Sequence, residues 1–293
     1  MNHVKTVALL GLLSGLLIAI SYGVLGGTLG AIAGISLAAI ANLGAWYYSD
    51  RIALAAYQAQ PVTPHQAPQL YRMVERLAQR ANIPTPAVYI IPQAAANAFA
   101  TGRDPEHAAV AVTQGILQQL PADELEGVIA HELTHILNRD TLTQAVAATI
   151  AGAISFLAQI LSYALWFGGG GRDDEGANPL ALLGTVILAP IAATVIQLGI
   201  SRTREFAADA GAAQLTGNPQ ALARALQRLE ANAQRRPMAG NPAFEPLMIV
   251  NAVPKQFLSN LFATHPSTQQ RVQRLLALES HPTPPAFGTP LGF

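Results

Sequence analysis

The chain has no cysteine, little charge and almost no lysine. Without cysteine it cannot form disulfides, thiolate metal sites or a cysteine nucleophile, and this composition fits a reducing compartment. Only 12% of its 293 residues are charged, which is about half the share of an average soluble protein. The formal net charge is zero, so the composition offers no electrostatic argument for nucleic-acid binding.

The few charged residues are distributed unevenly along the chain, and three long runs contain none. No Asp, Glu, Lys, Arg or His occurs in 6–49, 141–171 or 176–201. Because a membrane-spanning helix needs about 20 apolar residues, the runs predict four spans. The four predicted spans cover about 6–24, 28–48, 143–167 and 179–200. The alternative for the first run is a cleaved signal peptide, but the second apolar run directly after it favours a membrane span. The alternative for the last two runs is a pair of buried core helices, but their length favours membrane spans.

The residues that flank these runs predict an orientation. Lys5 precedes the first span and Arg51 follows the second. Arg202 follows the fourth, whereas the turn at 172–175 is acidic overall. Since positive residues are retained on the cytoplasmic side, we expect the chemistry-bearing segments to be cytoplasmic. The aromatic residues 46–48 close the second span, as expected at a membrane interface.

The segment His131-Glu132-Leu133-Thr134-His135 carries the clearest chemistry. On a helix, positions four apart share a face, so both imidazoles can bind one zinc ion. Glu132 lies about 100° round the helix and can act as general base toward a water at the metal. Acidic residues in the expected first turn after Pro121 favour a helix here. The alternative is a chance match on a polar helix face.

A catalytic zinc ion needs a third protein ligand. Asn138 and Thr141 stand where the metzincin pattern requires Gly and His, so that class is excluded. A glutamate on a later helix is the other common solution, and five glutamates follow the motif: Glu175, Glu205, Glu230, Glu245 and Glu279. Glu205 is favoured because Asp209 follows four residues later and could orient a ligating histidine. A salt-bridged surface carboxylate is the alternative for Glu205.

The remaining segments predict a mainly α-helical protein with a small mixed β-sheet. Strands are expected at 88–91, 97–102 and 109–113, before the zinc helix. The strand at 97–102 is expected at the edge of the sheet, where an extended peptide could add by main-chain hydrogen bonds; ordinary structural pairing is the alternative. The predicted parts are 1–50 (first hairpin), 51–140 (catalytic, with the zinc helix), 141–200 (second hairpin) and 201–293 (catalytic, with the third ligand).

Several motifs together resemble the HtpX membrane zinc metalloproteases. They are 131–140, 201–209, Thr264-His265-Pro266 with Arg271, and 97–102. The resemblance covers essentially the whole chain and implies a zincin-like bacterial inner-membrane endopeptidase that degrades damaged or misfolded membrane proteins, as part of a stress response. It implies no nucleic acid and leaves the oligomeric state open.

The resemblance also implies roles for individual residues. It assigns one Zn²⁺ per chain to His131, His135 and Glu205, with Glu132 as the base. Asp140 and Asp209 would support the ligands, and His265 and Arg271 would stabilise the oxyanion. The implied substrate-binding residues are Asn97, Ala98, Phe99, Ala100 and Thr101.

Two other functions remain open at this point. One is a non-proteolytic membrane scaffold or transporter with a structural zinc ion, although such a site has no use for a base at Glu132. The other is a specific processing peptidase like the prenyl-protein proteases. Four spans are few for the large enclosed chamber of that kind of enzyme.

Overall fold

The protein is mainly helical, with one small sheet. In a computed structural model of the whole chain, the structure describes residues 27–150, 202–235, 247–250 and 266–280, and some residues between 7 and 22. The helices are α2 (Gly27–Ala56), α3 (Pro68–Arg80), α4 (Gln114–Gln119), α5 (Ala122–Leu137), α8 (Arg202–Thr216), α9 (Pro219–Arg235), α10 (Thr268–Ser280) and the 3₁₀ turn η1 (Pro105–His107). The strands are β1 (Gln60–Pro61), β2 (Ala87–Ile91), β3 (Ala98–Gly102) and β4 (Ala108–Thr113).

The sheet is mixed and has the order β1-β2-β4-β3. β2 and β4 are parallel, whereas β1 and β3 pair antiparallel with their neighbours. β3 pairs with β4 only, so within the described residues it is an edge strand. This confirms the mainly helical class, the mixed sheet and the expected edge position of the segment after Asn97.

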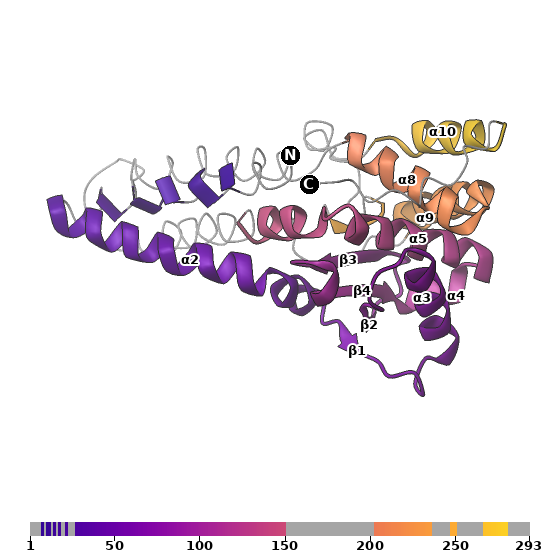
Figure 1. Cartoon of the computed structure of the whole chain (residues 1–293), viewed down its shortest axis with the longest axis horizontal. Coiled ribbons are helices and arrows are strands. Elements are labelled where there is room, and N and C mark those ends of the chain that lie inside the picture. Colours follow the sequence, from indigo (N-terminus) through magenta and orange to yellow (C-terminus); the bar gives the residue numbers. More distant parts are fainter. Residues whose placement is uncertain are drawn as a thin grey trace, which may run out of the picture.

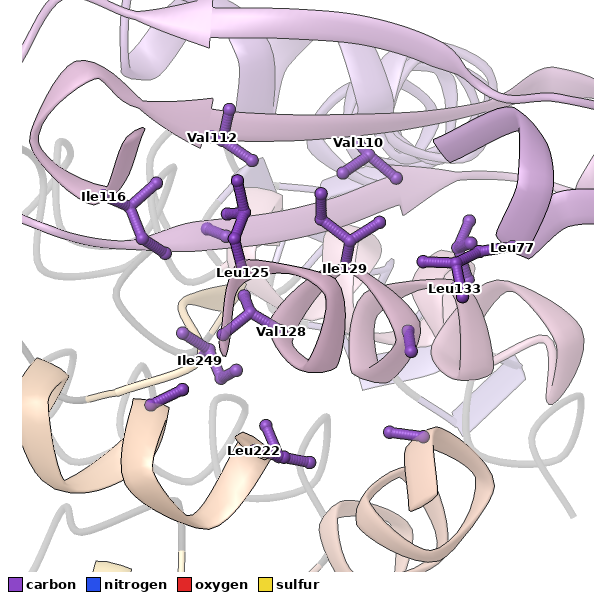
Figure 2. Close-up of a cluster of buried hydrophobic side chains, with 14 of the residues drawn as sticks. Leu77, Val110, Val112, Ile116, Leu125, Val128, Ile129, Leu133, Leu222 and Ile249 are labelled. Atoms are coloured by element: carbon purple, nitrogen blue, oxygen red, sulfur yellow. The ribbon is translucent and has the colours of Figure 1, made fainter. Parts of the chain in front are cut away.

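One face of the sheet packs against α5, the helix that carries the His-Glu-x-x-His motif. The apolar residues of α5 recur every three or four positions, which gives the helix a buried stripe. In Figure 2, Leu125 and Ile129 lie against Val110 and Val112 of β4. On the other side of α5, Val128 faces α9 and the segment 247–250. From Gly127 to Ile136 α5 is therefore buried, and the side chains of its polar motif are buried with it.

The opposite face of the sheet packs against the end of α2. Ala53, Leu54 and Tyr57 form a second core cluster with Phe99 of β3 and with the first turns after Thr141. The rings of Tyr57 and Phe99 lie 5.7 Å apart between centroids. The sheet therefore lies between the motif helix and the helix that enters from the apolar N-terminal region.

α2 is the one helix among the described residues that is long and apolar enough to cross a membrane. Figure 1 shows most of its length projecting away from the sheet. Its large apolar side chains are exposed on this projecting part: Leu29, Ile32, Ile35, Leu37, Ile40 and Leu43. Such a large exposed apolar surface indicates contact with lipid or another partner.

The described residues between 7 and 22 are helical and lie against α2. Asn42 donates a hydrogen bond to Ser14 at 2.8 Å. A Cβ on Gly34 would lie 2.6 Å from the Cα of Ile18, so the backbones approach closely. These contacts bring the two segments together, and the hairpin of spans one and two stays a prediction. The predicted spans three and four lie mostly outside the described residues, so a count of four is not established.

Three helices complete the fold around α5. α8 packs along α5, and α9 and α10 pack on α8 and on each other. α9 begins at Pro219, and the side chain of the preceding Asn218 accepts a hydrogen bond from the N–H of Ala221 at 3.1 Å. α9 also contacts α5 directly, so α8 is held beside the motif helix by α9 and α10 together.

Candidate metal centre

Three metal-binding side chains from two helices meet in the interior. α5 supplies His131 and His135, and α8 supplies Glu205 from its first turn. One donor atom of each residue lies within 4.8 Å of the other two, and all three side chains are buried. Of the two glutamates of α8 and α9, the structure therefore brings Glu205 to the histidines; Glu175 lies outside the described residues.

The spacing of these donors fits a tetrahedral ion. The two Nε2 atoms are 3.2 Å apart, and the Glu205 oxygens lie 3.5 Å from Nε2 of His135 and 3.7 Å from Nε2 of His131. Ligands at 2.0–2.1 Å from a tetrahedral zinc ion are separated by about 3.3 Å. The cluster thus has the dimensions of three corners of such a site.

The outer nitrogens of both rings face carboxylates. Nδ1 of His131 lies 3.0 Å from Asp209, and Nδ1 of His135 lies 3.2 Å from Asp140. A carboxylate at Nδ1 favours the tautomer with its proton there, which leaves the Nε2 lone pair toward the cluster. Two lone pairs and a carboxylate facing one point repel each other unless a cation lies between them. This is the observation that fits a metal ion to the site.

Burial and charge act oppositely on the two histidines. For His131, burial and the charge of Arg271 lower the pKa to about 4, against a raising effect of Asp209. For His135, burial also lowers the pKa, but the bond to Asp140 and the charge of Glu205 outweigh it and raise the pKa to about 9. Asp140 and Glu205 therefore favour positive charge at the ring of His135, whereas burial and Arg271 oppose it at the ring of His131.

Glu132 lies beside this cluster without belonging to it. Its side chain is buried, and burial, together with the charge of Glu205, raises its pKa to about 7 against the opposing charge of His135. The N–H of Ala100 on β3 donates a hydrogen bond to its carboxylate. A carboxylate with a raised pKa, held at an edge strand and next to a metal-binding cluster, has the properties of a general base.

Arg271 of α10 binds the carboxylate that faces His131. Its Nε and one Nη donate to the two oxygens of Asp209 at 2.9 and 2.7 Å. Its other Nη donates to the carbonyl of Ile249 at 2.9 Å and lies 3.9 Å from Glu205. The Asp209 pKa is lowered to about 2, because the Arg271 charge and hydrogen bonds outweigh burial. Arg271 thus lies near the site, as predicted, and is bound through its whole guanidinium.

A similar arrangement supports His135. Asp140 is buried, and Arg204 of α8 lies 3.7 Å from it. The backbone after α5 places Asp140 through a turn in which Arg139 has a φ of 55° and the N–H of Asp140 donates to the carbonyl of His135 at 2.9 Å. Both histidines therefore face an aspartate that is paired with an arginine.

The remaining predicted site residues are Asn97–Thr101 and His265. Residues Asn97–Thr101 form or adjoin β3, next to Glu132. His265 lies outside the described residues. No motif or periodicity predicted a role for the segment 247–250, whose Ile249 N–H donates to the carbonyl of Ala98 at 3.1 Å. The Asn97 side chain also donates to the carbonyl of Val250 at 3.1 Å.

Comparisons with known proteins agree on one family. The sequence profile of Peptidase family M48 matches residues 64–279. A protein from Trichormus variabilis described as "Protease HtpX homolog" is 73% identical over 280 residues, which cover 95% of this chain and 97% of the relative. A protein of the same description from Pyrococcus furiosus is 49% identical over 273 residues, covering 93% and 94%.

A solved structure with a related outline is that of Ste24p from S. mikatae. It matches with a TM-score of 0.47 and 20% identity, and the match covers 82% of this chain and 57% of that one.

Proposed function

The chain belongs to peptidase family M48 and is a metalloprotease, and from this premise we propose that it is a zinc-dependent endopeptidase of the cytoplasmic membrane face. Its substrates would be damaged or misfolded membrane proteins. The enzyme would degrade them in the inner membrane of a bacterium as part of a stress response. The observation that carries the proposal is the buried cluster of His131, His135 and Glu205, with Glu132 beside it.

His131, His135 and Glu205 would hold the zinc ion, one per chain. When bound, zinc polarises the carbonyl of the substrate and lowers the pKa of water. Glu132 takes a proton from the attacking water, and the raised pKa of Glu132 suits this transfer near neutral pH. As the new C–O bond forms and the peptide C–N bond breaks, Glu132 delivers the proton to the leaving nitrogen.

Asp209 and Asp140 would hold the two imidazoles in one tautomer and orientation. Arg271 holds Asp209 in turn, and its positive charge also lies 3.9 Å from Glu205. Stabilisation of the oxyanion by Arg271 and His265 stays a prediction from the resemblance. So does the binding of a substrate strand by residues 97–101.

The membrane location is supported by α2 and by the charges around it. The exposed apolar side chains from Leu29 to Leu43 of α2 are followed by Trp46, Tyr47 and Tyr48, and then by Arg51. An aromatic belt followed by a positive residue is typical of a cytoplasmic interface. The division into two hairpins and two catalytic segments, at residues 50, 140 and 200, stays a prediction.

The test combines zinc analysis with digestion. Purified wild-type protein and the Glu132→Gln variant are assayed for zinc content and for cleavage of casein and of an unfolded membrane protein, with and without chelator. We expect the variant to retain zinc and to lose cleavage by at least about a hundredfold, because it keeps the ligands and lacks the base. Undiminished cleavage by Glu132→Gln would contradict the mechanism, and a wild type indifferent to chelator would contradict the metal.

A further inference from the structure

The two helices that carry the metal-binding side chains run in opposite directions. Glu205, in the first turn of α8, lies 3.5 Å from His135 near the end of α5. Asp209, one turn further along α8, lies 3.0 Å from His131, one turn earlier on α5. The start of α8 therefore meets the end of α5. These two ends lie on either side of the stretch 141–201, which holds two of the three charge-free runs.

Asp140 and Arg204 form an ion pair where these two ends meet. A guanidinium nitrogen of Arg204 lies 3.7 Å from one carboxylate oxygen of Asp140. The other carboxylate oxygen of Asp140 lies 3.2 Å from Nδ1 of His135. One carboxylate therefore contacts both a metal-binding histidine and an arginine of α8.

Both partners of this ion pair are largely withdrawn from water. The Asp140 side chain is 2% exposed and that of Arg204 is 11% exposed. Burial lowers the pKa of Arg204, and the charges of Asp140 and Glu205 offset only part of this effect. Removal of one partner from a buried ion pair leaves an uncompensated charge, and water screens such a pair less than a surface pair. Arg204 and Asp140 are therefore held together more strongly than an exposed pair would be.

The ion pair also joins the backbone segments that carry two metal-binding side chains. The N–H of Asp140 donates to the carbonyl of His135 at 2.9 Å, so Asp140 is fixed to the end of α5 by its backbone as well. Arg204 directly precedes Glu205. Because the two are neighbours in the first turn of α8, holding the Arg204 side chain also holds the backbone of Glu205. His135 and Glu205 are thus joined through the ion pair, outside the metal-binding cluster itself.

We propose that Arg204 is a positioning residue of the metal centre. Its ion pair with Asp140 fixes the start of α8 to the turn after α5 and so sets the spacing between Glu205 and His135. The two ends of the stretch 141–201 are thereby joined at the site, and the third metal-binding side chain is in place before the metal arrives. This inference rests on the proposed zinc-dependent function and deepens it, because it names what holds two of the ligands together.

Zinc affinity distinguishes positioning from a simple effect of charge. Arg204 brings a positive charge close to the site, so its removal should strengthen the binding of a cation if charge alone mattered. We expect the opposite: Arg204→Gln should bind zinc about 10- to 100-fold more weakly than wild type, because two ligands lose their support. The affinity of the full-length protein in detergent is measured by competition with a chromogenic chelator. Equal or tighter zinc binding by Arg204→Gln would overturn the inference.

Arg202→Gln is the matched control, because it removes an exposed arginine from the same turn of α8. Its zinc affinity should stay within about twofold of wild type, since exposed charges contribute little. Arg204→Lys keeps the charge without the guanidinium and should bind zinc with an affinity between those of wild type and Arg204→Gln. A loss of zinc in Arg202→Gln as large as that in Arg204→Gln would also overturn the inference.

A double-mutant cycle tests whether Arg204 acts through Asp140. Asp140→Asn keeps a hydrogen-bond acceptor for His135 but removes the charge that pairs with Arg204. In the Asp140→Asn background, Arg204→Gln should change zinc affinity by less than about twofold, because the interaction is already lost. A full reduction in that background would show that Arg204 acts independently of Asp140, contrary to the inference.

The absorption spectrum of bound Co²⁺ reports the arrangement of the ligands without any substrate. Arg204→Gln should alter the visible bands of the Co²⁺-loaded protein, whereas Arg202→Gln should leave them unchanged. Thermal unfolding of the metal-free proteins shows whether each variant folds, and Arg204→Lys carries the same comparison if Arg204→Gln does not. A wild type that binds neither Zn²⁺ nor Co²⁺ would contradict the proposed function itself, whereas a metal-binding wild type with indistinguishable variants would contradict this inference alone.

Discussion

Arg271 holds Asp209 through two parallel hydrogen bonds, of 2.9 and 2.7 Å, inside the protein core. Asp209 in turn faces His131 at 3.0 Å. The planar guanidinium suits this bidentate contact, which a lysine cannot reproduce. The third donor of the arginine binds the carbonyl of Ile249, which pairs with β3. One side chain therefore connects the metal-binding cluster to the edge strand.

We expect Arg271→Lys to weaken zinc binding by about 10- to 100-fold, because the aspartate that orients His131 loses its support. Loss of part of a buried ion pair should also lower the free energy of unfolding by about 3 kcal/mol or more. Zinc affinity is measured by competition with a chromogenic chelator, and stability by thermal unfolding in detergent.

The matched control for this variant is Arg274→Lys. Arg274 lies on the same helix and is exposed, over the ring of Phe206 at 3.8 Å. The Arg274→Lys variant should keep its zinc affinity within about twofold of wild type, since exposed charges contribute little to stability or to ligand positioning. Equal zinc affinity of Arg271→Lys and wild type would show that Arg271 does not position the ligand.

Glu132 gives the metal-free protein a distinctive pH dependence. Its pKa is raised from 4.5 to about 7 in the folded state, mainly by burial. Between these values the unfolded chain has released the proton and the folded protein still holds it, so stability falls as pH rises from 4.5 to 7, by about 3 kcal/mol at most. Glutamine has no proton to lose. The free energy of unfolding of Glu132→Gln should therefore be similar to that of wild type at pH 4.5 and higher than that of wild type at pH 8.

The measurement is thermal unfolding of chelator-treated wild type and Glu132→Gln across this pH range. The two histidines titrate in both proteins, so their contributions largely cancel in the difference. The exposed Glu75 provides the control substitution, Glu75→Gln, which removes a carboxylate that lies outside the buried cluster. Parallel curves for Glu132→Gln and wild type would mean that the folded protein does not hold the Glu132 proton.

Local sequence predicted the parts of the site that depend on helix geometry. The four-residue spacings from His131 to His135 and from Glu205 to Asp209 each put two side chains on one helix face. The sequence also predicted strands at 97–102 and 109–113, which the structure has as β3 and β4. Periodicity is a local property, and these features need no knowledge of the rest of the chain.

The connections between segments could not be predicted in this way. The pairing of Ile249 with β3 and the approach of Arg271 to Asp209 depend on how α10 packs on α8, and 247–250 has no periodic pattern. The short α4 was also missed, although it had a signal: Thr113 accepts from the N–H of Ile116 at 3.1 Å, as an N-cap does.

The buried carboxylate of Glu124 ties the start of α5 to α9. Arg228 lies 2.8 Å from it and Arg224 3.4 Å. Both arginines are about half exposed, so water screens the pairs, and we expect Glu124→Gln to cost about 1–2 kcal/mol of unfolding free energy. Zinc content and casein cleavage at low temperature should stay near wild type, because the pairs lie at the opposite end of α5 from His135.

The neighbouring Asp123 provides the control for this prediction. It pairs with Arg224 at 2.8 Å, but about half of its side chain is exposed. Asp123→Asn should therefore change the free energy of unfolding by less than about 0.5 kcal/mol. A loss of zinc in Glu124→Gln without a loss of stability would show that this carboxylate acts on the site and not on helix packing.

α8 approaches α5 closely at Gly211, and we expect this contact to set the position of Glu205 on the same helix. A Cβ at Gly211 would lie 2.4 Å from the methyl group of Thr134, inside the motif. Gly211→Ala should push the helices apart, lower the free energy of unfolding by about 1–3 kcal/mol and reduce zinc content. Thermal unfolding and zinc analysis measure both effects.

A second substitution separates this packing effect from a general loss of helix stability. Thr134→Ala removes the methyl and hydroxyl groups that a Cβ at Gly211 would meet, and leaves its own Cβ at 3.2 Å. The double variant Gly211→Ala, Thr134→Ala should therefore recover zinc content relative to Gly211→Ala alone. Alanine is a better helix former than glycine, so a loss that persists in the double variant would mean that close approach at this point does not position Glu205.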